Sequence, residues 1–350
     1  MSLEKKLSWD TFKRIDLYPK ICWIPKSSEK VTLAVGSTNK KEGACFFLGD
    51  FDTLSTEKSL LVAPEERCSI EKKSIPFLEN FHRPFYQKRV DLPTLAQWQS
   101  TIAHALKLIQ QQNMDKVVLA RKTLLYYEKE IDPWELFLAL KQKSTERDTL
   151  FCIEYTKGEA FLGATPEMLF TREGCQLTTM ALAGTSPITE DSYHLLHSKK
   201  DKQEVEHVVD FLIKTLLPIS TTINLSPLEV LKSARVQHLC HHLQAKLKPT
   251  ITDQMLLKKL HPTPALGGSP KKSSLAFIKK HELFTRGFYG APVGWLSEER
   301  SDLFVAIRSC KVSKNTVELF AGTGIVEGSD PTLEWDELEH KISLLLELLT

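Results

Sequence analysis

Apolar residues along the chain follow two periods, which predict a mixture of strands and helices. Short apolar runs at 21–24, 31–35 and 44–48 are separated by Gly, Pro and Lys, as is typical of short strands. The same reasoning predicts further strands at 116–120, 150–155, 160–162 and 168–171. The runs 303–312 and 317–321, joined by Ser-Lys-Asn-Thr, predict two strands of a hairpin.

Three segments instead repeat apolar residues every three or four positions, which predicts helices with one buried face. They cover 94–112, 198–217 and the C-terminal segment that follows Asp330, which is suited to cap a helix beginning at Pro331. The predicted buried stripe of the last helix consists of Leu338, Ile342, Leu345 and Leu349. Strands and helices interleave irregularly, so an α+β fold is favoured over a regular βαβ series.

The composition of the chain bears on whether it binds nucleic acid or a membrane. The 350 residues are 42% hydrophobic and 26% charged, with 46 Lys plus Arg against 44 Asp plus Glu and no basic stripe. We therefore expect no nucleic-acid partner. No segment reaches the roughly 20 apolar residues of a membrane span, and the start lacks a secretory apolar run, so we expect a cytoplasmic protein without a membrane partner.

The seven cysteines are scattered and form no C-x-x-C pair. This pattern suggests neither a zinc site nor a disulfide framework. We expect small buried or half-buried side chains in a reducing compartment.

Two residues have settings suited to proton transfer. Lys116 begins a predicted apolar strand, where burial would disfavour its charged form and make it a candidate general base. Glu167 follows the turn-like stretch 163–166 and precedes an apolar run, and such surroundings raise the pKa of a carboxyl group and suit a general acid. The alternatives are a solvated Lys at a strand end and a surface Glu, and these two residues alone do not decide between the readings.

Other charged residues suggest binding of a cation and an anion. Glu204 and Glu206 lie near the start of one predicted helix, and Glu334 and Glu337 lie near the start of the last one. One Glu from each helix could hold Mg²⁺, although acidic first turns also stabilise helices by themselves. Arg308 interrupts an apolar strand and needs an acidic partner, for which a substrate carboxylate or a structural acid would serve equally. The Gly322-Thr323-Gly324 segment could offer backbone N–H groups to an anion, and Lys341 could be only the i,i+4 ion-pair partner of Glu337.

Nine motifs occur in one order between residues 115 and 341. They are DKVVLAR (115–121), FLGATPEMLF (161–170), ALAGTSP (181–187), SKKDKQE (198–204), LHPTPALGGSPK (260–271), FYGAPVGW (288–295), VAIRSC (305–310), LFAGTGIV (319–326) and SDPTLEWDELEHK (329–341). Together they resemble the chorismate-binding enzyme family, which includes anthranilate synthase component I and the aminodeoxychorismate, salicylate and isochorismate synthases. The resemblance implies one catalytic domain over 1–350, with a divergent part at 1–90 and a motif-bearing part at 94–350. The implied fold is a layered α/β/β/α sandwich with two mainly antiparallel sheets.

The resemblance also implies residue roles. Lys116 would activate water and Glu167 would protonate the departing 4-hydroxyl group of chorismate. Glu204 and Glu337 would bind Mg²⁺, with Glu206 and Glu334 acting nearby through water. The implied substrate-binding positions are Gly184, Thr185, His238, Ala265, Arg308, Gly322 and Lys341. For His238 the alternative is a packed, hydrogen-bonded core histidine.

Two positions discriminate among members of the family. Ala183 stands where aminodeoxychorismate synthases carry a nucleophilic Lys, and Ala265 stands where anthranilate and salicylate synthases usually carry Thr. The resemblance therefore predicts an isochorismate synthase, an isomerase that adds water at C2 without loss of pyruvate and without a glutaminase subunit. Salicylate synthase and anthranilate synthase component I remain alternatives, and a catalytically silent binding protein fits least. Thr323 replaces the usual Ala and Lys199 a common Glu, and the pathway that uses the product, for menaquinone, a siderophore or salicylate, stays open.

Overall fold

The computed structural model describes residues 7–37, 43–52, 59–79 and 81–350, and its strands form two layers. The first layer has the strand order β4 (Leu60–Glu71), β2 (Lys30–Ser37), β1 (Lys20–Ile24), β7 (Thr149–Thr156), β8 (Glu159–Thr165), β17 (Ser309–Ser313), β18 (Thr316–Ile325), β6 (Lys116–Tyr126) and β5 (Lys88–Leu92), with β14 (Gly268–Ser269) beside the start of β6. The second has the order β4, β3 (Cys45–Leu48), β15 (Pro292–Leu296), β16 (Arg300–Val305), β9 (Met168–Glu173), β10 (Gln176–Pro187) and β13 (Val236–Leu247), with β11 (Ser220–Leu225) and β12 (Glu229–Lys232) along β13. Each of these pairings is antiparallel, and β4 joins the two layers because it pairs with β2 and with β3.

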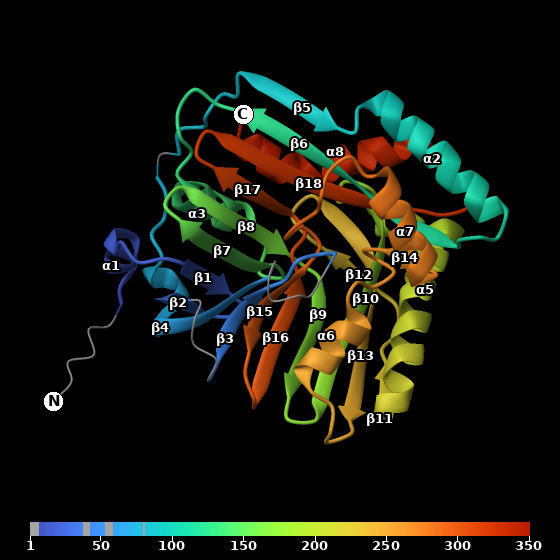
Figure 1. Cartoon of the computed structure of the whole chain (residues 1–350), viewed down its shortest axis with the longest axis horizontal. Helices are drawn as coiled ribbons and strands as arrows, with labels where there is room; N and C mark the ends of the chain where they lie inside the picture. The colour runs from blue at the N-terminus through green and yellow to red at the C-terminus, as the bar shows by residue number, and fades with distance from the viewer. Residues whose placement is uncertain (1–6, 38–42, 53–58, 80) are drawn as a thin grey trace.

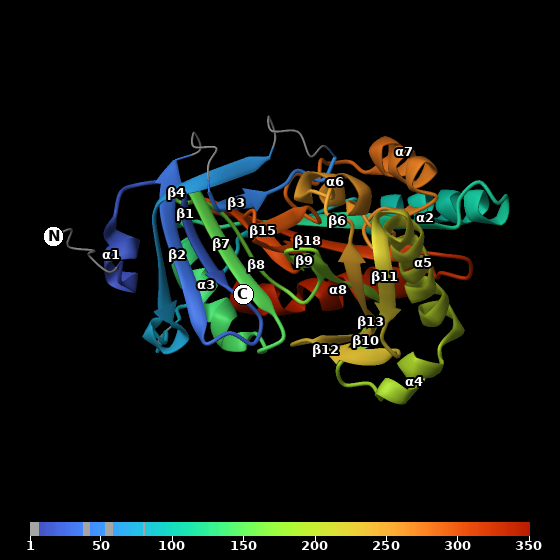
Figure 2. The same ribbon diagram turned by 90° about the horizontal axis from the view of Figure 1, so that it is seen from below.

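Helices cover the outer faces of both layers (Figures 1 and 2). They are α1 (Trp9–Arg14), α2 (Leu95–Gln110), α3 (Pro133–Lys143), α4 (Ser192–His197), α5 (Lys199–Leu216), α6 (Asp253–Leu260), α7 (Lys271–His281) and α8 (Pro331–Leu348), with short 3₁₀ turns at Lys72–Ser74 and Leu217–Ile219. The helices α3 and α8 contact β8 and β18 of the first layer, and α5 contacts β10 and β13 of the second.

Three apolar clusters correspond to the three interfaces between layers. One packs Trp98 of α2, Phe137 of α3 and Leu338 of α8 on the first sheet, and another packs Val205 of α5 on the second. The third lies between the sheets, where the ring of Trp23 is 5.7 Å from that of Phe304. The α/β/β/α sandwich with antiparallel sheets is therefore confirmed.

The periodicity predicted the long helices well. The segment 94–112 contains α2, which begins after the capping box of Thr94 and Gln97. The C-terminal segment contains α8, and the Asp330 carboxylate accepts hydrogen bonds from the N–H groups of Thr332 and Leu333, as expected of an N-cap. None of the helices that the structure describes is long and apolar enough to cross a membrane.

The predicted single strand over 303–312 is wrong. The segment contains β16, which belongs to the second sheet, and β17, which belongs to the first, and the chain crosses between the layers at residues 306–308. Arg308 has φ of +52°, a left-handed conformation that ends any continuous strand. The predicted hairpin is correct for β17 and β18.

Candidate active site

A cavity of about 660 Å³, including its open mouth, lies between the two sheets. Its wall comes from β10, β13 and β18, from the start of α5, from α8 and from the segments beside β16 and α7. The lining residues are Val118, Glu167, Leu182, Ala183, Gly184, Thr185, Glu204, His238, Ala265, Leu266, Arg286, Tyr289, Ile307, Arg308, Phe320, Ala321, Gly322, Gly324 and Lys341. The lining mixes charged, polar and apolar side chains, which suits a small polar molecule.

Lys116 is fully buried beside this cavity and is ion-paired with Glu204. Its Nζ lies 2.9 Å from Oε1 of Glu204, which α5 brings to the cavity wall. Burial opposes ionisation of Glu204, but the ammonium groups of Lys116, Lys341 and Lys200 together outweigh it, and the pKa of the carboxyl group falls below its usual value. The alternative of a solvated Lys at a strand end is therefore excluded for Lys116.

Glu167 lies between β8 and β9, is 6% exposed and lines the cavity. Burial raises the pKa of its carboxyl group to about 7, although the positive charges of Lys116, Lys341 and Arg308 oppose the shift. A carboxyl group with such a pKa carries a proton near neutral pH and can donate it. The geometry thus gives Glu167 the properties of a general acid.

Arg308 and His238 form a hydrogen-bonded pair in the cavity wall. The guanidinium Nη2 lies 3.0 Å from Nε2 of His238, and Nη1 donates to the Lys341 carbonyl at 3.3 Å. Because Arg can only donate, Nε2 of His238 accepts, which places the imidazole proton on Nδ1 beside the Gly184 carbonyl and the Thr185 hydroxyl. Burial, with the charges of Arg308 and Lys341, lowers the pKa of His238 well below its usual value, so the ring is neutral.

Among the described residues, no carboxylate lies within 4 Å of the Arg308 guanidinium, whose contacts are to the imidazole and a carbonyl. Of the two partners weighed from sequence, the structural acid is therefore absent from the described part of the chain. The guanidinium is free to bind a carboxylate that enters the cavity. Lys341 lines the same wall, and its Nζ donates to the Gly322 carbonyl at 2.8 Å.

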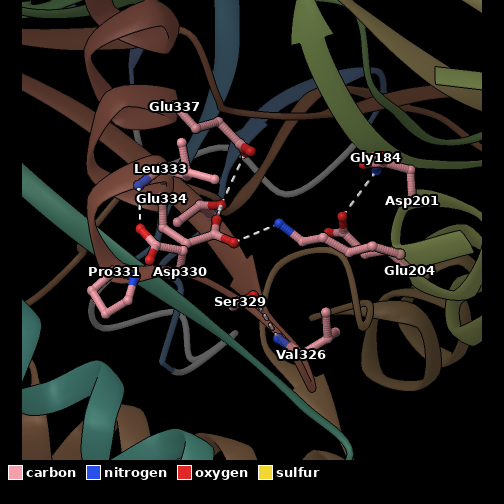
Figure 3. A network of polar contacts seen from close by, with 12 residues as sticks. Gly184, Asp201, Glu204, Val326, Ser329, Asp330, Pro331, Leu333, Glu334 and Glu337 are labelled. Atoms are coloured by element: carbon pink, nitrogen blue, oxygen red, sulfur yellow. Dashed lines mark hydrogen bonds and ion pairs between the residues drawn. The ribbon is translucent and has the colours of Figure 1, made fainter. Parts of the chain in front are cut away.

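Figure 3 shows Glu204 of α5 together with Glu334 and Glu337 of α8. Glu204 lines the cavity, and the other two glutamates line an adjoining hollow that shares Thr185 with it. Each of the three glutamates pairs with a different lysine. Glu337 pairs with Lys341 at 2.5 Å, Glu334 pairs with Lys200 at 2.6 Å, and Glu204 pairs with Lys116. The Lys200 ammonium interacts electrostatically with all three carboxylates, so the acids lie within range of one cation. This donor set fits Mg²⁺, which prefers carboxylate oxygens and retains several waters. A metal ion would replace lysine charges beside Glu204 and Glu337.

The structure revises the setting of three predicted positions. Gly322-Thr323-Gly324 is not a turn but part of β18, paired with residues 118–120 of β6, and both of its glycines line the cavity. Its second glycine makes room for side chains, because a Cβ on Gly324 would lie 2.4 Å from Oε1 of Glu204. Gly184 forms a bulge in β10 with φ of +71°, and its N–H donates to Oε2 of Glu204 at 3.1 Å. Glu206 is exposed on the outer side of α5. It lies two positions after Glu204, and side chains two positions apart on a helix point in nearly opposite directions.

Sequence reasoning missed a buried ion pair that contributes Arg286 to the cavity wall. Arg286 pairs with Glu282 and donates to the carbonyls of Leu266 and Val118 at 2.8 Å each. It also missed Lys200, which lies four residues before Glu204 on α5 and so on the same helical face. That spacing was the available signal for Lys200, whereas the Arg286 contacts are set by tertiary structure alone.

Thr323 bridges two glutamates of α8. Its hydroxyl lies 2.5 Å from Oε2 of Glu334 and 3.0 Å from Oε1 of Glu337, and the residue is 2% exposed. We expect Thr323→Val, which keeps the shape and removes the hydroxyl, to lower the free energy of unfolding by about 1–3 kcal/mol, because it deprives buried carboxylates of a donor. Urea denaturation measures this, with Thr323→Ser as the matched control that retains the hydroxyl. Equal stability of the Val variant and the original protein would show that water or Lys200 fully replaces the bond.

Comparison with known proteins agrees with this geometry. The sequence profile of the family described as "Chorismate binding enzyme" matches residues 26–350. A chloroplastic isochorismate synthase of Catharanthus roseus is 34% identical over 272 residues, covering 75% of this chain and 47% of that protein. The isochorismate synthase MenF of Escherichia coli is 35% identical over 264 residues, covering 73% of this chain and 61% of the relative. The matched part of the chain thus spans about half to three fifths of these curated relatives.

A solved structure of an isochorismate synthase also resembles this chain. The structure of the menaquinone-specific isochorismate synthase MenF from Escherichia coli superposes with a TM-score of 0.88 and 27% identity, over 100% of this chain and 92% of that one. The profile match covers most of the chain, and the superposition extends over all of it. This chain therefore belongs to the chorismate-binding enzyme family.

Proposed function

We propose that this protein converts chorismate to isochorismate with the help of Mg²⁺. The observation that carries the proposal is the Arg308 guanidinium, which has no carboxylate partner among the described residues and lines the same cavity as Glu167, a buried acid of pKa about 7. Chorismate carries two carboxylates and a leaving hydroxyl group, which match a guanidinium, an ammonium and a proton donor. The relatives named above are isochorismate synthases, which supports the same substrate.

The proposed reaction is an allylic displacement in which water adds and a hydroxyl group leaves. Lys116, which pairs with Glu204 as an ammonium in the structure, would have to act in its amine form, accepting a proton from water as the water oxygen bonds to C2. The ring double bonds shift, the C4–O bond breaks, and Glu167 donates a proton to the departing hydroxyl, which leaves as water. Atoms balance, since one water enters and one leaves. Arg308 and Lys341 orient the substrate carboxylates, and the cavity limits access of other water molecules.

Mg²⁺ would be held by Glu204 and Glu337, and when bound it would neutralise charge at the ring carboxylate. The three lysines beside Glu204, Glu334 and Glu337 indicate that these acids need balancing cations. Because Mg²⁺ needs few protein ligands, two carboxylates with water suffice.

Two small residues in the cavity wall support water as the nucleophile. Ala183 and Ala265 both line the cavity, and neither can offer an amine or a hydroxyl group to the substrate. Their positions favour a product that keeps its enolpyruvyl group. The proposal includes neither an ammonia-supplying glutaminase subunit nor an elimination step.

The decisive experiment is product analysis. Purified protein incubated with chorismate and Mg²⁺, with and without ammonium, is expected to form isochorismate alone. Chromatography resolves the products, and a lactate dehydrogenase couple measures pyruvate. Stoichiometric pyruvate with salicylate would identify a salicylate synthase, and anthranilate formed only with ammonium would identify an anthranilate synthase. Either result would refute the isochorismate proposal, and unchanged chorismate would identify a silent binding protein.

A further inference from the structure

A second group of metal-ligating side chains lies outside the active-site lining, at one edge of the second sheet. It consists of Glu229, Cys240 and His242, whose ligand atoms all lie within 4.8 Å of one another. Nε2 of His242 is 3.1 Å from Oε1 of Glu229 and 3.9 Å from Sγ of Cys240. The proposed reaction uses none of these residues.

The backbone holds this group in place. Glu229 on β12 is the direct cross-strand partner of Cys240 on β13. Cys240 and His242 are two residues apart on one strand, so their side chains point to the same face. The pairing of β13 with β10 over residues 236–246 keeps this strand in register. The three side chains are thus brought together by strand geometry and not by a flexible loop.

The chemistry of the three ligands selects a class of metal. Thiolate, imidazole and carboxylate are the ligand types of zinc, whereas Mg²⁺ prefers oxygen alone. Ligand atoms around a tetrahedral zinc ion lie roughly 3.4–3.6 Å apart, given Zn–N, Zn–O and Zn–S bonds of about 2.0–2.3 Å. The distances of 3.1 and 3.9 Å lie on either side of these values, so small side-chain shifts would complete the geometry.

The surroundings leave a route of entry and a place for a fourth ligand. The side chains of Glu229 and His242 are 56% and 35% exposed, whereas Cys240 is buried. Burial raises the pKa of the Cys240 thiol to about 12, so without metal the thiol keeps its proton. Binding would release that proton as the sulfur–metal bond forms.

One cation already lies near the group. The charge of Lys26 interacts with both Cys240 and Glu229, while burial lowers the pKa of the Lys26 ammonium. Burial disfavours the charged form of Lys26, so a metal ion bound to the thiol and the carboxylate could take the place of its positive charge. Lys26 thus competes with a metal ion for this position.

We propose that Glu229, Cys240 and His242 form a three-ligand Zn²⁺ site whose fourth position is open to solvent. The site is distinct from the carboxylates beside the cavity, yet near the cavity itself, because His238, which lines the cavity, lies on the same face of β13 as Cys240. Its spacing along the chain follows no familiar Cys and His pattern, since one ligand comes from the neighbouring strand. This group of ligands could therefore not be predicted from the order of residues along the chain.

Cobalt substitution tests the proposal without reference to catalysis. The full-length protein, in excess Mg²⁺ to occupy oxygen sites, is titrated with Co²⁺ and monitored for the near-ultraviolet band of a thiolate–cobalt bond and the visible bands of tetrahedral Co²⁺. One equivalent per chain is expected to produce both, and Zn²⁺ is expected to remove them. Cys240→Ser should abolish the thiolate band, Glu229→Gln and His242→Gln should weaken binding at least about 10-fold, and Lys26→Met should strengthen it.

Two matched controls separate this site from other thiols and imidazoles. Cys175→Ser removes a half-buried thiol elsewhere, and His241→Gln removes the adjacent imidazole, which contacts the Ser226 carbonyl. Both variants should bind as the original protein does. A thiolate band that survives Cys240→Ser, or no band at saturating Co²⁺, overturns the proposal. If Cys240→Ser fails to fold, the exposed Glu229 and partly exposed His242 variants decide, since unchanged affinity in both would also overturn it.

Discussion

Glu167→Gln is expected to lower kcat by about 10²–10⁴-fold, the usual contribution of positioned proton transfer. Gln has nearly the same shape as Glu but cannot donate an acidic proton to the departing hydroxyl group. The other cavity residues keep their contacts, because the interactions of the Glu167 carboxyl with Lys116, Lys341 and Arg308 are only electrostatic. Steady-state kinetics with chorismate measure the change, and Glu206→Gln on the exposed side of α5 is the matched control.

The pH profile gives a second signature of the same residue. Since the carboxyl group has a pKa of about 7 and acts when protonated, kcat/KM should fall as pH rises through about 7. Glu167→Gln should lose this alkaline limb. A variant with a near-normal rate and an unchanged limb would assign the proton donor elsewhere.

Stability should change with pH in a related way. Folding raises the pKa of Glu167 from about 4.3 in an unfolded chain to about 7. The folded state therefore binds the proton more tightly, so its free energy of unfolding falls as pH rises from the lower value through the higher one. Urea denaturation across this range should show a smaller fall in Glu167→Gln, and this readout does not depend on activity.

The periodicity of apolar residues predicted the long helices of this protein. The features that it did not predict depend on contacts between residues far apart in sequence. The helices α2, α5 and α8 were predictable because their apolar stripes repeat over several turns. The crossing at Arg308 was not predictable, because an apolar run looks the same in one strand as in two strands of different sheets. The packing role of Gly324 in β18 was not predictable either, because the close approach of Glu204 to Gly324 joins residues far apart in sequence.

In the candidate site, too, the sequence identified single residues, and the fold was needed to identify their partners. Motif resemblance selected Lys116 and Glu204, but only the fold reveals that they form one buried ion pair across 88 positions. The partner of Arg308 stayed open from sequence, because a structural acid could have come from any strand or helix. From sequence, Thr323 was only a replacement of the family's usual Ala, whereas the fold directs its hydroxyl to Glu334 and Glu337.

Removal of divalent cations is expected to abolish turnover, and added Mg²⁺ is expected to restore it. The physical reason is charge, because Glu204 and Glu337 would otherwise face an anionic substrate. Two like charges 4 Å apart repel by about 4 kcal/mol at an effective dielectric constant near 20. Chorismate assays on EDTA-treated protein, dialysed and then titrated with Mg²⁺, measure the effect.

Variants distinguish a metal role for these glutamates from a structural one. Glu204→Gln and Glu337→Gln should each raise the Mg²⁺ concentration needed for half-maximal activity by at least about 10-fold, whereas Glu206→Gln should leave it unchanged. Cys240→Ser should keep the full Mg²⁺ requirement, because its thiol belongs to the separate group on β12 and β13. Full activity in EDTA would remove Mg²⁺ from the proposal. In that case Lys116, Lys200 and Lys341 would be the cations that balance the three acids during turnover.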